Sequence, residues 1–429
     1  MSTRRWLGTN LATNALFGVL GLASSSLAGW TLGADGRGRL AALQVTPAMV
    51  GLLAGAGLPE SVVFHLSKKV DDDGRILGTA TRLLVVTSVL VTAVALAPAA
   101  FVLGRYDHST RVIGLVLVIA APAVAMTNLW HQALRGLQRS GAWNLVRLIG
   151  ASTWLVAIIV GAIAGRRSSV AGGTYVALVV PTLVATIWLT RRAMTSPLRV
   201  APELRRPLLR FALPSVAASV PLFLNLRLDQ VVLTRVASQR QLGLYAAAAG
   251  FTWAVNPPLQ AIASVAFPSV AAIRDPAEQR LRLLQITRLA TPVCGLTALA
   301  VGLTTPVALP LLNGPDFRAA VPVALVLVVA GTVFAYEYIL EEAARGIGLP
   351  RVALLGQLAG LVCTLTGLAV FIPRLGIMGA GWASVAGYST ACGTELLILR
   401  RRMDCRLRTL LLPTRTDISW LVQRLRARG

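Results

Sequence analysis

Apolar runs of about twenty residues recur along the whole chain, and they restrict the folds open to it. A helical run of this length matches the hydrocarbon core of a bilayer, where the backbone must satisfy its hydrogen bonds internally. The sequence therefore predicts an all-α integral membrane protein with twelve transmembrane helices. The expected spans, with approximate bounds, are residues 11–31, 41–66, 79–103, 112–134, 143–164, 172–190, 209–235, 242–270, 285–311, 320–344, 352–372 and 377–399.

The charged residues predict how the spans are oriented. Only 14% of the 429 residues are charged, whereas soluble domains carry about 25%. The formal charge of +24 would indicate nucleic acid in a soluble protein, but here most basic residues lie in short loops and the tail. With a cytoplasmic N-terminus, 30 Lys and Arg residues fall inside and 10 outside. This asymmetry predicts a multi-pass protein with both termini cytoplasmic and no nucleic-acid partner.

Two pairs of short motifs suggest that the chain is duplicated. GRLAA at 38–42 follows the first span, and GLYAA at 243–247 follows the seventh. ALRGL at 133–137 ends the fourth span, and AARGI at 343–347 ends the tenth. Two halves of six spans each have the same orientation, so an axis along the membrane normal should relate the two six-helix bundles. The expected parts are an N-terminal bundle (1–195), a basic cytoplasmic linker (196–208), a C-terminal bundle (209–400) and a basic cytoplasmic tail (401–429).

The tail has two interpretations. Ile418, Leu421, Val422 and Leu425 are spaced as on one face of a helix, with arginines on the other faces. This pattern is typical of a short interfacial helix on an anionic leaflet, although a disordered basic tail fits the composition equally well.

The seventh span contains charges that a bilayer tolerates poorly. Arg227 and Asp229 lie inside an apolar run, where a charge near the membrane centre costs about 2.5 to 3.5 kcal/mol. Such residues usually face a cavity, so Arg227 is the first candidate for binding an anionic substrate, with Asn225 and Gln230 beside it. The alternative is a structural salt bridge between helices, and Asp229 is either an ion-coupling group or part of that bridge.

Three other spans carry carboxylates. In the tenth span, Glu337 is deep enough to be a proton or cation site, whereas Glu341 and Arg345 have the spacing of a local ion pair. Glu60 follows Pro59, where a kink is expected, and can pair with a basic residue of another helix. Glu395, near the inner end of the last span, is expected to face Arg400. Pro257 and Pro258 predict a second kink, in the eighth span.

Sequence motifs for catalysis and metal binding are absent. The chain has no GxxxxGK[ST], HExxH or GxSxG motif, and its four cysteines have no metal-ligand or CxxC spacing. We therefore assign no catalytic residues, no metal ligands and no bound cofactor. An enzyme is not expected, and energy would come from an ion gradient, carried by H⁺ or Na⁺, or from mass action.

Several motifs together resemble a known family. LGADGRGRLAALQ at 32–44 and GLPE at 57–60 look like the start of polysaccharide transporters, the Wzx-like oligosaccharide flippases. RLDQ at 227–230 followed by LGLYA at 242–246 resembles their seventh and eighth spans, and the Arg-Gly turns also fit. The resemblance covers essentially the whole chain. It indicates the superfamily that also includes multidrug and cation antiporters and the lipid II flippase.

The resemblance implies a flippase of the bacterial plasma membrane that works by alternating access. Its substrate would be an undecaprenyl-diphosphate-linked oligosaccharide, moved from the inner to the outer leaflet for export of a cell-surface polysaccharide. Arginine suits diphosphate oxygens, so Arg227 would bind the diphosphate and Arg147 and Arg210 would recruit it at the inner mouth. The implied partners are the lipid-linked glycan, membrane lipids, and a polysaccharide polymerase and glycosyltransferases.

Two alternative functions remain open from the sequence. An ion-coupled multidrug or cation antiporter would depend on Glu337 or Asp229 rather than on Arg227. A non-transporting membrane scaffold for glycan assembly would leave Arg227 unexplained.

Overall fold

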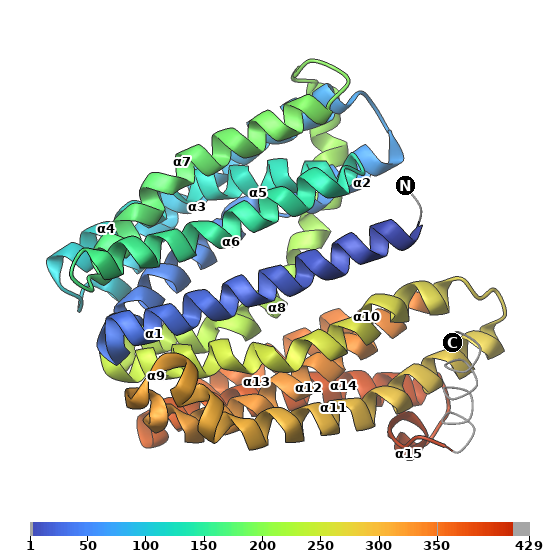
Figure 1. Ribbon diagram of the computed structural model, residues 1–429. Coiled ribbons are helices and arrows are strands. Elements are labelled where there is room, and N and C mark those ends of the chain that lie inside the picture. Colours follow the sequence, from blue (N-terminus) through green and yellow to red (C-terminus); the bar gives the residue numbers. More distant parts are fainter. Residues whose placement is uncertain (1–2, 350, 415–429) are drawn as a thin grey trace. The chain divides into compact units, whose positions relative to one another are not determined.

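The computed structural model describes residues 3–349 and 351–414, and every regular element in them is helical (Figure 1). The predicted tail helix at residues 418–425 lies outside these residues. The first half contains α1 (Thr3–Gly55), α2 (Leu58–Lys68), α3 (Asp73–Leu103), α4 (His108–Ile119), α5 (Ala121–Gly136), α6 (Ser140–Ile163) and α7 (Ser168–Ala193). The second contains α8 (Arg205–Val236), α9 (Gln239–Thr252), α10 (Asn256–Ala271), α11 (Pro276–Asn313), α12 (Val321–Gly346), α13 (Arg351–Leu375), α14 (Ile377–Arg402) and α15 (Leu407–Leu411).

Many of these helices are apolar and long enough to cross a membrane. Within the described residues seven single helices qualify, and the number rises to nine if two bent pairs each form one span. Their outward side chains include Val94, Ile163 and Leu303, which are large, apolar and exposed, as expected for a surface that faces lipid. The protein is therefore an all-helical multi-pass membrane protein.

Helix breaks occur at glycines and prolines. The expected loop between the first two spans is absent, because α1 is two helical stretches joined at Gly33, whose φ of 66° is in the left-handed region. Pro59 lies in the first turn of α2, which begins directly after another left-handed glycine, Gly57. A short 3₁₀ turn precedes Pro257 and Pro258 at the start of α10, so both predicted kinks are present. Pro122 lies in the first turn of α5, which is bent by 45° from α4.

The helices form two compact units. One comprises Met1–Val220, Gln230–Ala246 and Leu312–Asp316, and the other comprises Pro221–Asp229, Ala247–Leu311 and Phe317–Gly429. In the first unit α6 packs on α7 and α1, and α2 packs on α5. In the second, α14 packs on α13 and α12, and α12 also packs on α10.

The two Arg-Gly motifs form the same turn in the two units. α5 ends at Gly136 and α12 ends at Gly346, and the residue two positions later has a positive φ in both cases (Gln138, 58°; Gly348, 79°). A Cβ on Gly136 would lie 2.8 Å from Leu66 Cβ, and one on Gly346 would lie 2.7 Å from Val270 Cβ. The shared turn supports the internal repeat that the motifs predict.

The other motif pair meets face to face in the first unit. A Cβ on Gly38 of α1 would lie 1.8 Å from the carbonyl oxygen of Gln239, and one on Gly243 of α9 would lie 1.8 Å from that of Ala34. Each glycine thus contacts the residue four positions before the other glycine. The contact is reciprocal and leaves no room for a side chain on either helix.

A carboxylate fixes the linker to the first unit. Asp73 Oδ2 accepts hydrogen bonds from the backbone N–H (2.7 Å) and the hydroxyl (3.0 Å) of Thr195, and Oδ1 accepts from the backbone N–H of Ser196 (3.0 Å) and from its hydroxyl. Burial alone would raise the pKa of Asp73, but these hydrogen bonds outweigh it and hold the pKa below its ordinary value of 3.8.

We expect Asp73→Asn to be less stable than the wild type at pH 7 by about 1 to 3 kcal/mol, because an amide cannot accept all of these hydrogen bonds. A lowered pKa stabilises the folded protein above the unfolded pKa, and this stabilisation is lost as the pH falls through the folded value. The melting temperatures of the wild type and the variant in detergent would be measured from pH 7 down to pH 3. The gap between them should narrow below about pH 4. A constant gap would contradict the assignment.

Candidate functional site

A buried polar network runs through the second unit, and Asn225 of α8 is at its centre. Its side-chain N–H groups donate to the side-chain oxygen (3.0 Å) and the backbone carbonyl (3.1 Å) of Gln357 on α13. The hydroxyl of Thr364 donates to Asn225 Oδ1 (3.2 Å), and that of Tyr388 on α14 donates to the Asn225 carbonyl (3.1 Å). Asn225 is fully buried, so these contacts use its polar groups to join α8 to α13 and α14.

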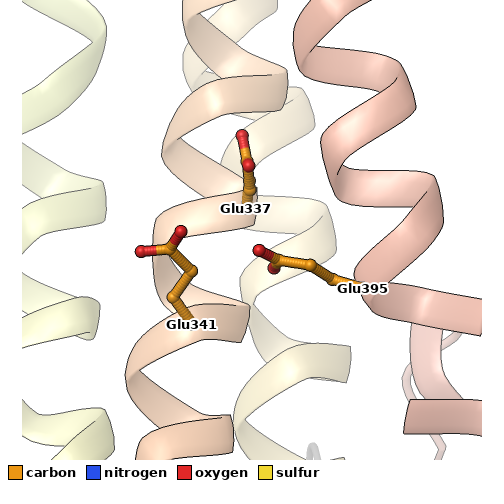
Figure 2. A group of neighbouring side chains, drawn as sticks. All are labelled: Glu337, Glu341 and Glu395. Atoms are coloured by element: carbon orange, nitrogen blue, oxygen red, sulfur yellow. The ribbon is translucent and has the colours of Figure 1, made fainter. Parts of the chain in front are cut away.

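Gln357 connects this network to three glutamates, which we call the carboxylate triad: Glu337 and Glu341 of α12 and Glu395 of α14 (Figure 2). The side-chain amide of Gln357 donates to Glu337 Oε1 (2.9 Å) and to Glu341 Oε1 (3.0 Å). One oxygen from each glutamate lies within 4.8 Å of the others. Figure 2 shows Glu395 reaching from α14 toward the two glutamates of α12.

Small residues bring α13 and α14 close enough to place Glu395. A Cβ on Gly356 of α13 would lie 2.6 Å from both Cγ and Oε1 of Glu395. One turn further along, Gly360 faces Ala391 and the carbonyl of Gly387. The glycines therefore provide the space in which the third carboxylate reaches the two on α12.

Arg227 lies two residues from Asn225 in the same helix. It is half-buried, and no salt bridge joins it to a carboxylate in the part of the chain that the structure describes. It interacts electrostatically with Tyr388, as does Asp229. Asp229 is buried, and one of its oxygens accepts from the hydroxyl of Ser384 at 3.4 Å. Ser384 and Tyr388 are one turn apart on α14, so both charged residues of α8 lie near this helix.

The first unit has a largely apolar cavity of about 220 Å³ that includes several polar side chains. Arg147 of α6 lines it together with His131 and Tyr175. The guanidinium lies over the rings of Phe17, at 4.3 Å, and Trp143, at 5.6 Å. Stacking of this kind holds the guanidinium of an arginine in place.

The predicted site residues are thus distributed over both units. Asn225, Asp229, Glu337, Glu341 and Arg345 come together in the second unit, with Arg227 beside them. Arg345 contacts Glu341 at 3.5 Å, as predicted, but lies closer to Glu342, at 2.8 Å. Arg147 is in the first unit, as are Gln230, which is buried, and Glu60 and Arg210, which are exposed.

One expectation from the sequence is wrong. Glu395 does not pair with Arg400; it is fully buried, and neither of its carboxylate oxygens has a hydrogen-bond partner among the described residues. The side chain points toward α12 because the gap at Gly356 accepts it. Sequence reasoning also missed Gln357 and Tyr388, since uncharged polar residues in a span carry little signal by themselves. The small residues on α13 and α14 were the available clue that these helices approach closely.

Comparison with known proteins identifies both a family and a fold. A family model described as polysaccharide biosynthesis protein matches residues 19–274. The structure is similar to an inward-facing multidrug resistance MATE family transporter of the MOP superfamily, with a TM-score of 0.74, 15% identity, and 90% of this chain and 94% of that one covered. It is also similar to the lipid II flippase MurJ in an inward closed conformation, with a TM-score of 0.73, 10% identity, and coverage of 91% and 87%. No similar sequence was found among curated proteins.

Proposed function

Because the chain belongs to the polysaccharide biosynthesis protein family, as its motifs predict, we propose that it is a flippase for a lipid-linked oligosaccharide. In this proposal the protein moves an undecaprenyl-diphosphate-linked glycan from the inner to the outer leaflet of a bacterial plasma membrane. Twelve spans in two six-helix bundles, with both termini cytoplasmic, open alternately to the two sides. The fold shared with MOP-superfamily structures supports this arrangement.

The position of Arg227 is the main observation behind the substrate assignment. Within the described part of the chain no carboxylate forms a salt bridge with this cation, and a diphosphate would supply the counterion that a cation in an apolar helix needs. The planar guanidinium can bind two phosphate oxygens at once, which an ammonium cannot do in the same geometry. Arg227 would therefore bind the diphosphate, and Arg147 and Arg210 would contact it earlier on its path.

Ion coupling is a second part of the proposal. Asp229 and the carboxylates Glu60, Glu337 and Glu341 are the groups that can carry H⁺ or Na⁺ during the transport cycle. No catalytic step is needed, because the substrate is moved and not changed. A polymerase and glycosyltransferases would act before and after this step.

Leaflet accessibility tests the proposal directly. Proteoliposomes containing an undecaprenyl-diphosphate oligosaccharide would be exposed to a reagent or enzyme that modifies only the outer-leaflet glycan. We expect the modified fraction to rise from about half toward completion only when the protein is present. If no such lipid is moved while an organic cation is taken up, the antiporter assignment replaces this one. If neither is moved by correctly folded protein, the scaffold assignment gains support.

A further inference from the structure

The carboxylate triad contains polar atoms that no contact among the described residues satisfies. Glu337, Glu341 and Glu395 are 0%, 2% and 0% exposed. Gln357 uses both of its amide N–H groups on Glu337 Oε1 and Glu341 Oε1. Glu337 Oε2 and both oxygens of Glu395 have no hydrogen-bond partner among the described residues. Three buried carboxylate oxygens thus lack a donor, an arrangement that is costly unless a proton or a ligand compensates for it.

The charge around the triad is also unbalanced. Arg345 is the cation paired with Glu341, but it is 42% exposed and its shorter contact is with Glu342. When all three carboxylates are ionised, they face at most one arginine and leave a deficit of about two positive charges. The nearby side chains of Gln357, Cys392 and Tyr388 are not cations and cannot supply them.

We propose that the carboxylate triad is a binding site for one hard cation, and that its charge favours a divalent ion of the size of Ca²⁺. All the side-chain groups that would bind the ion are carboxylates, whose oxygens hard cations prefer as ligands. Ca²⁺–O distances of about 2.3 to 2.6 Å place ligands on opposite sides of the ion roughly 4.6 to 5.2 Å apart, while Mg²⁺ needs about 4.2 Å or less. One oxygen from each glutamate lies within 4.8 Å of the others, which leaves room for an ion of the size of Ca²⁺.

The amide of Gln357 orients the site. Asn225 donates to the Gln357 side-chain oxygen, so the Gln357 N–H groups must point to the glutamates. Its two donated bonds hold Glu337 and Glu341 in position and leave their other lone pairs free for an ion. The site thereby links α8, through Asn225, to α12 and α14. Cation binding itself does not depend on the proposed lipid substrate, although a role in driving transport would.

Equilibrium binding to purified protein in detergent tests the site without any lipid substrate. The probes are ⁴⁵Ca²⁺ alone and, in competition with it, Mg²⁺ and Na⁺ at constant ionic strength. We expect saturable binding of one Ca²⁺ per chain, with Mg²⁺ and Na⁺ competing more weakly. Glu395→Gln and Glu337→Gln should each weaken binding at least about tenfold, because each removes a charged ligand while keeping its shape. Glu278→Gln, at an exposed position in α11, is the matched control and should bind as the wild type does.

A second pair of variants tests the geometry with all three carboxylates intact. Gly356→Ala places a methyl group 2.6 Å from Glu395 Oε1 and should weaken Ca²⁺ binding, whereas Gly393→Ala, which meets nothing within 4 Å, should not. Size-exclusion profiles and melting temperatures without added cation show whether each variant is folded. Folded wild-type protein that binds no cation saturably would overturn the proposal, and shared protons would then balance the charge. Binding that all the triad variants retain would also overturn it.

Discussion

Proteoliposomes that contain the Arg227→Ala variant are expected to move lipid-linked oligosaccharide at least about a hundred times more slowly than wild-type proteoliposomes. Removing a charge that is paired with a ligand in a partly buried site commonly weakens the binding free energy by about 2 to 5 kcal/mol or more. This loss corresponds to a factor of about 30 to several thousand in affinity. Arg227 is half-buried in α8 and has no carboxylate partner among the described residues, so its loss should weaken anion binding without exposing an unpaired acid. The initial rate of outer-leaflet exposure measures the effect.

Two further variants show what the arginine provides. Arg227→Lys should recover part of the rate if charge alone is needed and almost none if two phosphate oxygens are bound at once. Arg205→Ala, on the exposed first turn of the same helix, controls for the loss of a cation and should transport normally. Equal melting temperatures in all three variants would show that a loss of transport is not caused by a loss of folded protein. Near-normal transport by well-folded Arg227→Ala would contradict the proposal that Arg227 binds the diphosphate.

The largest effect on stability is expected at Gly38 and Gly243. An added methyl group at either position would lie 1.8 Å from a backbone carbonyl oxygen, so the helices themselves must separate. Overpacking that side chains can relieve costs about 1 to 3 kcal/mol, and a backbone clash should reach at least the upper end of this range. Gly38→Ala and Gly243→Ala should each lower the melting temperature in detergent and the yield of monodisperse protein. The stability lost by the double variant should be smaller than the sum of the losses in the two single variants, because both changes disrupt the same contact.

Gly18→Ala and Gly21→Ala are matched controls for this prediction. Both positions are on α1, and an added Cβ meets nothing within 4 Å at either one. Alanine is the better helix former by about 1 kcal/mol, so these variants should melt at the wild-type temperature or above it. Wild-type melting of Gly38→Ala would show that α1 and α9 do not approach as closely as described.

Much of the helical architecture could be predicted from the sequence, because apolar runs and helix-breaking residues act locally. The kinks at Pro59 and at Pro257 and Pro258 lie where those residues predict them. The expected loop after residue 31 could not be corrected from the sequence, since a helix that continues through Gly33 and a helix that stops there have the same composition. The number of membrane spans depends on such continuity.

The candidate site was less predictable, because it depends on which faces of distant helices meet. The spacing of Glu337 and Glu341 placed them on one face of α12, and the structure has them there. The partner of Glu395 was misassigned, since a nearby arginine is the simplest choice when the packing of α13 on α14 is unknown. Only the positions of Gly356 and Gly360 against α14 bring Glu395 to α12.

The reciprocal contact between Gly38 and Gly243 also bears on the origin of the chain. Two copies of one protein make contacts of this kind across a twofold axis, since each copy supplies both surfaces. A single ancestral glycine followed by Arg-Leu-Ala-Ala or Leu-Tyr-Ala-Ala would have met its own copy in the same way. Such a contact allows a half-length ancestor to pair as a homodimer before gene fusion, and after fusion each glycine is constrained by the other.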